Sequence, residues 1–197
     1  MILEGIVTTC APDGKINIAP MGPHVTPQMD RLVLRPFRTA DTYRNLKAHG
    51  EGVFHVTDDV LLLAKTAVGS VAPLPPMTPA SHVRGHVLEG ACRYYEFRVL
   101  AVDDLDQRAR FEAEVVHCGH LRDFFGFNRG KHAVLEAAIL ATRISLLPAS
   151  EIRAEFARLR ILVEKTGGAQ ENEAFVFLSQ YVERECQANT TGEPKKP

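Results

Sequence analysis

The dominant spacing of apolar residues changes near residue 120 of this chain, from a period of two residues to a period near 3.6. Up to about residue 120, most of the sequence consists of short alternating runs separated by Gly and Pro, which is typical of β-strands. In the last third, apolar residues recur three or four positions apart, which indicates amphipathic helices. This order predicts an α+β protein in which helices follow a β-domain.

Six antiparallel strands are predicted in the first part. The first two, 2–9 and 15–20, are joined by the turn signal Ala11-Pro12-Asp13-Gly14 and form a hairpin. The other strands are expected at 31–37, 52–57, about 86–103 and about 107–119. Helices are expected at 39–50, with Thr39 as its cap, and at 58–68, and a proline-rich loop at 69–85. Such a set predicts a small closed or partly closed barrel.

Three helices are predicted in the last third, at 130–146, 149–166 and 171–187. The last two form an antiparallel hairpin around Gly167-Gly168. We therefore divide the chain into a barrel (1–125), a helical subdomain (126–187) and a disordered tail (188–197). The helix at 130–146 has a face of small residues, and this face predicts a homodimer. It consists of Ala133, Ala137, Ala138 and Ala141.

Composition limits the classes of function. The net charge of −1 and the pI of about 6.7 argue against nucleic acid as a partner. No signal peptide and no apolar run long enough for a membrane span is found, so we expect a cytoplasmic protein without a membrane partner. The four scattered cysteines are expected to be buried, reduced thiols.

Two segments carry candidate polar sites. In 33–46, a strand, a short loop and a helix start offer Arg35, Thr39 and Thr42, a set that suits a phosphate. The alternative is a capped helix with a solvated basic face. Before the helix at 130–146, Asn128 and Arg129 are either a cap with a flanking charge or a polar pair delivered to a site.

A metal site on "HCGH" is the third candidate. His117, Cys118 and His120 are possible zinc ligands, and His82 and His86 are further histidines. Alternation along a strand sends His117 and Cys118 to opposite faces, which argues for ordinary strand-end residues. We assign no metal ligand.

The strand at 15–20 ends abruptly in "NIAPMGPH", where Pro20, Gly22 and Pro23 break it. Either this is a simple turn, or a backbone edge is shaped to lie against a flat ligand.

Taken together, five stretches resemble domain-of-unknown-function family 447, in the FMN-binding split-barrel superfamily of flavin reductases and pyridoxamine-phosphate-oxidase-like proteins. They are "EGIVTTCAPDGKINIAPMGPH", "TYRNL", "VTDD", "FNRGKHAVLEAAILATR" and "EKTGGAQENEAF". One departure is His55, where the family leads us to expect asparagine.

The resemblance implies a split barrel that binds FMN, usually as a homodimer with the flavin in the interface. It implies that Asn17, Ala19, Pro20 and Met21 lie along the flavin ring. It also implies that Arg35, Thr39 and Thr42 hold the phosphate, and that Asn128 and Arg129 contribute from the helical side. Arg129 is our candidate catalytic residue, because a positive charge favours reduction of the flavin.

Three functions remain open. The first is an FMN-dependent oxidoreductase acting on an unknown small molecule or a nicotinamide-type reductant. The second is a non-catalytic FMN carrier or sensor, and the third is a metal-dependent enzyme built on "HCGH". The proline-rich loop and the added helices favour the first, because they could enclose a substrate.

Overall fold

The computed structural model describes residues 1–191, and these form two compact units. The first unit comprises Met1–Asp58 and Ala72–Phe124, and the second comprises Asp59–Val71 and the chain from Phe125 onward. Each unit is described by itself.

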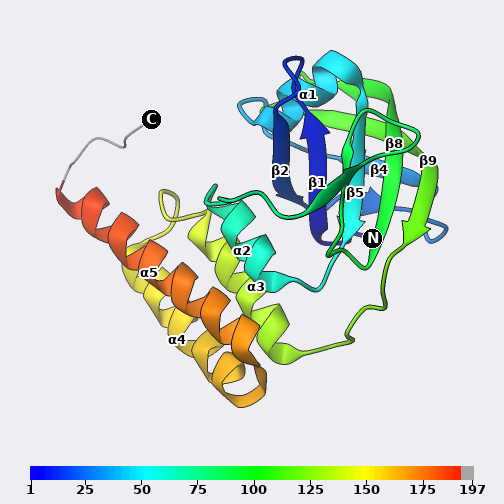
Figure 1. Cartoon of the computed structure of the whole chain (residues 1–197). Coiled ribbons are helices and arrows are strands. Elements are labelled where there is room, and N and C mark those ends of the chain that lie inside the picture. Colours follow the sequence, from blue (N-terminus) through cyan, green and yellow to red (C-terminus); the bar gives the residue numbers. More distant parts are fainter. Residues whose placement is uncertain (192–197) are drawn as a thin grey trace. The chain divides into compact units, whose positions relative to one another are not determined.

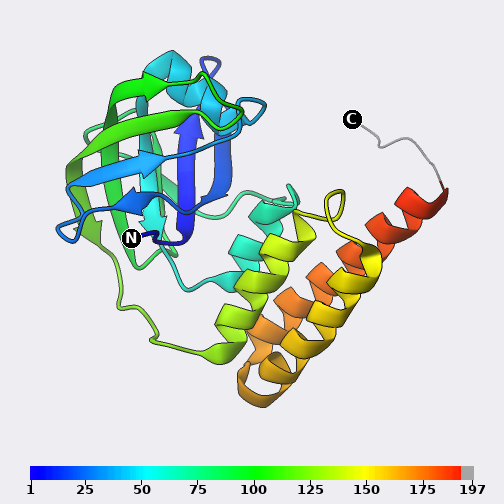
Figure 2. The ribbon, with the colours of Figure 1, turned by 180° about the vertical axis from the view of Figure 1, so that it is seen from behind.

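The first unit is built on one antiparallel seven-stranded sheet. Its strands are β1 (Gly5–Cys10), β2 (Ile16–Met21), β3 (His24–Val25), β4 (Arg31–Leu34), β5 (Glu51–Val56), β8 (Arg93–Asp103) and β9 (Arg110–His120). Their order is β2-β1-β5-β8-β9-β4-β3, and the sheet curls strongly on itself (Figures 1 and 2). This is an antiparallel split barrel, so the predicted α+β fold class is confirmed.

The β1–β2 hairpin forms at the predicted turn. Gly14 has a positive φ of 87°, a conformation that favours glycine, and its N–H donates to the Ala11 carbonyl at 2.9 Å. The pairing sets Val7 opposite Ala19, and Val7 faces the interior of the barrel. The interior is filled by apolar side chains from six strands and one helix, among them Val7, Leu34, Leu46, Phe54, Phe97 and Phe111.

The region 69–103 differs from the prediction. The expected long strand at 86–103 is two strands, β7 (His86–Leu88) and β8, separated by a turn in which the Ala91 N–H donates to the Leu88 carbonyl. The proline-rich loop contains β6 (Met77–Pro79), which pairs with β7 in a separate two-stranded sheet. Proline is tolerated there because β6 lies at a sheet edge.

Helix α1 (Asp41–His49) lies over one end of the curled sheet (Figure 1). It places Leu46 in the core, with Tyr43 packed against it. The helix ends at Gly50, whose φ of 66° is left-handed and whose N–H donates to the Leu46 carbonyl.

The second unit consists of four helices that pack on one another, α2 (Val60–Ala67), α3 (Arg129–Ala141), α4 (Ala149–Thr166) and α5 (Ala169–Thr191). Asp59 caps α2 by accepting the Leu62 N–H at 2.9 Å. The start of α3 passes close to the α4–α5 turn, since a Cβ on Gly130 would lie 2.9 Å from the Gly167 Cα. A side chain at Gly130 would push these segments apart.

The small-residue face of α3 is already covered inside this unit. Ala133, Ala137, Ala138 and Ala141 are each at most 3% exposed. Helix α3 packs against α2, α4 and α5 of the same chain. This face is therefore not available to a second copy of the chain, and the prediction of a homodimer loses this argument.

At the C-terminus, α5 continues to Thr191, past the predicted helix end at 187. The rest of the predicted tail, 192–197, lies outside the described residues. None of the described helices is long and apolar enough to cross a membrane.

Candidate functional site

Strand β2 forms one edge of the barrel sheet. In the described part of the chain it pairs with β1 alone, so its other backbone edge has no strand beside it. Pro20 is exposed and lacks an N–H, as suits an edge position, while Asn17, Ala19 and Met21 are half-buried. An open edge offers backbone donors and acceptors to a flat polar ligand.

Asn17 connects this edge strand to α1. Its Nδ2 donates to the Thr42 Oγ1 at 3.0 Å and to the Thr9 Oγ1 at 3.2 Å. Asn45, one turn further along α1, donates to the same Thr9 oxygen at 3.0 Å. Thr9, Thr42 and Asn45 are buried, so β1, β2 and α1 share one polar cluster. Of the predicted flavin-binding residues, Asn17 and Thr42 are thus brought together.

The start of α1 has no side-chain cap. Ala40, not the predicted Thr39, is the N-cap residue, so the predicted cap is wrong. Thr39 is exposed in the preceding turn, and its carbonyl accepts a bond from Arg44 at 2.7 Å. The N–H groups of the first turn therefore have no capping side chain, although Asp41 adds a negative charge there that Arg44 binds.

Arg35 follows β4 and has other neighbours. It lines a hollow of about 310 Å³ together with His24, Val33 and Arg110. The hollow is basic, although Glu112 forms an ion pair with Arg110. The structure therefore separates the predicted phosphate residues into two groups, with Arg35 in this hollow and Thr42 in the cluster with Asn17.

Asn128 and Arg129 lie in the second unit. The Asn128 Oδ1 accepts the Lys131 N–H at 3.0 Å and caps α3, while its Nδ2 donates to the Thr166 carbonyl at 2.9 Å. Both ends of this amide thus have a structural function within the helical unit. Arg129 is the exposed first residue of α3.

The outer face of the barrel sheet carries buried polar residues, of which the sequence singled out His55 but not Glu96. They hold residues 81–88, called here the strap, against the sheet. Glu96 is fully buried on β8 and accepts the backbone N–H groups of Ser81, His82 and Val83. Alternation gave no hint of it, because a charged residue in a strand usually faces solvent.

His55 also holds the strap. Its Nδ1 donates to the Ile6 carbonyl at 3.1 Å, and its Nε2 accepts the Leu88 N–H at 3.0 Å. Burial lowers the pKa of His55 from 6.5 to about 4, although the bond to Ile6 opposes this shift. Both ring nitrogens thus have a structural function where the family led us to expect asparagine.

The "HCGH" residues are divided as alternation predicts. Cys118 is exposed, which corrects the expectation that all four cysteines are buried, whereas Cys10, Cys92 and Cys186 are buried. His120 lies 3.1 Å from Asp123. His117 instead stacks on His82 of the strap, with ring centroids 4.2 Å apart.

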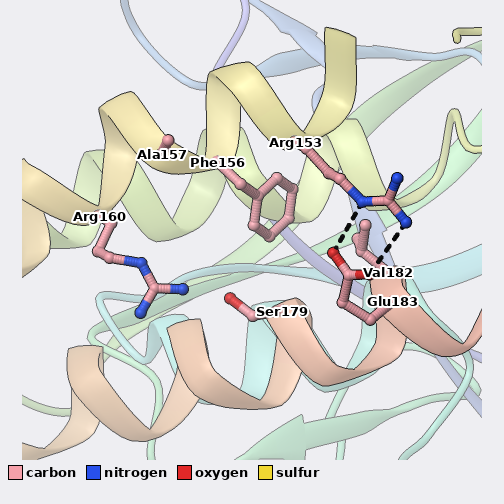
Figure 3. A pocket seen from close by; sticks show the side chains of 7 residues that line it. All are labelled: Arg153, Phe156, Ala157, Arg160, Ser179, Val182 and Glu183. Carbon is pink, nitrogen blue, oxygen red and sulfur yellow. Dashed lines mark hydrogen bonds and ion pairs between the residues drawn. The ribbon is translucent and has the colours of Figure 1, made fainter. Parts of the chain in front are cut away.

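A second hollow, of about 230 Å³, lies between α4 and α5 (Figure 3). The ring of Phe156 lies between the two helices there, and Arg153 and Glu183 form an ion pair at 3.0 Å at one end. Arg160 lies further along α4, over the ring of Phe175. Its one carboxylate is bound to Arg153 and its Ser179 hydroxyl donates to the Phe175 carbonyl, so few of its polar groups are left to orient a ligand.

Comparison with known proteins bears on both parts of the chain. The family model described as "Protein of unknown function (DUF447) N-terminal domain" matches residues 3–122. A second family model, described as "Protein of unknown function (DUF447)", matches residues 128–180. A crystal structure of an FMN-bound protein from Methanosarcina mazei, of the same family, is similar with a TM-score of 0.78. It is 23% identical, with 91% of this chain and 94% of that chain covered.

Two other solved structures resemble a smaller part of the chain. The styrene monooxygenase flavin reductase from Pseudomonas putida is 14% identical, with a TM-score of 0.51 and with 60% of this chain and 79% of that chain covered. Flavoredoxin from Methanosarcina acetivorans is 13% identical, with a TM-score of 0.52 and with 60% of this chain and 68% of that chain covered. At these identities the structures show a shared fold, and the match of the family models over most of the sequence shows that the chain belongs to the DUF447 family.

Proposed function

We propose that this chain is a cytoplasmic, homodimeric FMN-binding protein and a flavin-dependent oxidoreductase that acts on a small molecule. The observation that carries the proposal is the bond between Asn17 and Thr42 at 3.0 Å. It joins an open strand edge to an uncapped helix start, and a flat polar ring with a phosphate tail needs both. The FMN found in the Methanosarcina mazei protein of the same family adds support.

The residues present fit such a cofactor. The open edge of β2, from Asn17 to Met21, has backbone groups for the polar edge of the ring. The first turn of α1, with Thr39 and Thr42, has N–H and hydroxyl donors for the phosphate. Arg35 offers a guanidinium in the basic hollow, which is the alternative place for the phosphate. When bound, FMN supplies hydride or electron transfer, and the chain binds, orients and shields it.

If the site is built around a phosphate, FMN should bind more tightly than riboflavin. Loss of a charge-assisted phosphate contact costs about 1.5–3 kcal/mol, or roughly ten- to a hundredfold in affinity. We expect Arg35→Ala to weaken FMN while riboflavin changes little, and Thr42→Val to weaken FMN more than riboflavin, as measured by quenching of flavin fluorescence. Because the two residues lie in different groups, the variant with the larger loss identifies where the phosphate binds.

Arg158→Ala is the matched control, since Arg158 lies on α4 of the second unit, where it is bound to Glu155. Equal affinity of the wild-type protein for riboflavin and FMN would show that the phosphate assignment is wrong.

Oxidoreductase activity is tested separately from binding. We expect NADH or NADPH to reduce the bound flavin faster than free FMN, followed without oxygen by the loss of flavin absorbance. A protein that binds FMN but does not accelerate its reduction by either donor would instead be a carrier or sensor.

A further inference from the structure

Three potential metal ligands meet where the strap crosses the sheet. They are His82 on the strap, Glu96 on β8 and His117 on β9, and their ligand atoms all lie within 4.8 Å of one another. Glu96 and His117 are cross-strand partners, so their side chains share one face of the sheet. A bulge follows directly in the pairing, and bulges often re-aim side chains beside functional sites.

The buried carboxylate lacks a full countercharge. Glu96 is 0% exposed and accepts three backbone N–H groups, with the His82 Nδ1 3.9 Å from its Oε2. Arg98, two residues along the strand, binds Glu51 and the His82 carbonyl instead. Buried charges in proteins are usually paired or bound to a metal, and backbone N–H groups carry only partial charge.

We propose that His82, Glu96 and His117 bind one divalent transition metal of the zinc class. Two imidazoles and a carboxylate are an established zinc donor set, whereas Mg²⁺ and Ca²⁺ prefer oxygen ligands throughout. With one ligand from each of three segments, the metal fastens the strap to β8 and β9. His82 is 52% exposed, so the fourth position is open to water.

The ligands must close in slightly to bind. Metal–ligand bonds of about 2.0–2.1 Å in a tetrahedral zinc site place the ligand atoms roughly 3.3 Å from one another. In this structure the three ligand atoms lie within 4.8 Å of one another. The two rings now stack at an angle of 23°, and a metal must lie in the plane of each ring it binds. One ring therefore has to turn, and the half-exposed His82 has the space to do so. Cys118 is not a ligand of this site, because it is exposed on the face of β9 opposite to His117.

The test uses the full chain without a polyhistidine tag, freed of metal by a chelator and titrated with Zn²⁺ in a calorimeter. We expect one Zn²⁺ per chain in the wild-type protein. His82→Ala and His117→Ala should each weaken binding by more than about a hundredfold, since even loss of an outer partner costs 10–100-fold. Mg²⁺ should not compete, and Zn²⁺ should raise the melting temperature of the wild type but not of His82→Ala.

His132→Ala and Cys118→Ser are the controls, because both residues are exposed and lie outside the cluster. His82→Ala keeps the backbone bonds to Glu96, so it should stay folded, which circular dichroism checks. Zinc binding by His82→Ala at wild-type affinity, or no uptake by the wild type at micromolar Zn²⁺, would overturn the proposal. The cluster would then be a histidine stack that only anchors the strap.

Discussion

At the scale of single residues, His55 shows how one buried side chain makes stability depend on pH. Its Nε2 accepts the Leu88 N–H, so the ring cannot take a second proton without losing that bond. Burial lowers its pKa from 6.5 to about 4. Between these values the unfolded chain binds a proton that the folded chain does not, so the free energy of unfolding falls as the pH drops below 6.5.

The full effect of His55 amounts to about 3 kcal/mol, at 1.36 kcal/mol per pKa unit. We expect most of this contribution to the free energy of unfolding to be lost between pH 7 and pH 4.5, as measured by urea unfolding. Over this range the free energy of unfolding should fall further in the wild-type protein than in His55→Gln. Glutamine can donate to Ile6 and accept from Leu88 without titrating. The exposed His24→Gln serves as control, and parallel pH curves for wild type and His55→Gln would contradict the prediction.

Arg129 is the catalytic candidate that the family resemblance suggests. A positive charge near the ring favours the form that has gained electrons, so Arg129→Ala should lower the reduction potential of the bound flavin and slow its reduction. FMN affinity should change less. Potentiometry of the flavin-loaded variant checks this against Lys165→Ala, a lysine in the last turn of α4. An unchanged potential would leave Arg129 as a surface charge beside the Asn128 cap.

At the scale of elements, the helical unit is held by an ion pair that is largely buried. The Lys131 Nζ of α3 lies 2.7 Å from the Glu171 Oε1 of α5, with side chains only 15% and 7% exposed. The other Glu171 oxygen accepts the Gly168 N–H at 2.7 Å. Burial raises the pKa of Glu171, but Lys131 and Gly168 outweigh it and hold the pKa below its usual value.

Removing one partner of this pair should leave a buried charge. We expect Lys131→Met to lower the free energy of unfolding by about 3 kcal/mol, measured in urea, and Lys131→Met with Glu171→Gln to recover part of the loss. Arg158→Met is the control, because it breaks the exposed pair with Glu155 and should cost less than about 1 kcal/mol. Similar losses in Lys131→Met and Arg158→Met would refute this role.

The elements that could be predicted are those with local signals. Ala11 to Gly14 indicate a turn by residue type alone, and Gly50 and Gly167 end helices whose period is visible in the sequence. The separation of β7 from β8 and the pairing of β6 with β7 depend on contacts between distant segments. Such contacts leave no periodic signal in either segment.

The candidate site was predictable only in part, for the same reason. Residue type and position at a helix start pointed to Thr42, but nothing in the sequence showed that Asn17 would bond to it from 25 positions away. Glu96 and His117 lie 21 positions apart, and register alone makes them neighbours. Sequence distance grouped Arg35 with Thr39, although Arg35 lines a hollow with residues of β3, β4 and β9.

At the scale of the whole molecule, the proposed homodimer now rests on exposed apolar side chains. Leu100 and Val102 of β8 are 54% and 40% exposed. We expect light scattering to give twice the chain mass of 21.8 kDa, and Leu100→Glu with Val102→Glu to give monomers. Leu105→Glu, at a turn residue that is 90% exposed, should leave the dimer intact. A monomeric wild type at micromolar concentration would refute the dimer.

The hydrogen bonds that hold the strap determine which of its residues can be replaced during evolution. The strap's backbone N–H and C=O groups form hydrogen bonds with four side chains of the sheet, those of Thr8, His55, Glu96 and Arg98. Every residue type except proline supplies both backbone groups. Most strap side chains can therefore be exchanged without loss of these bonds, whereas replacing any of the four sheet residues by one that lacks the bonding group breaks one. Related chains should thus keep the backbone conformation of this segment while its residue types diverge.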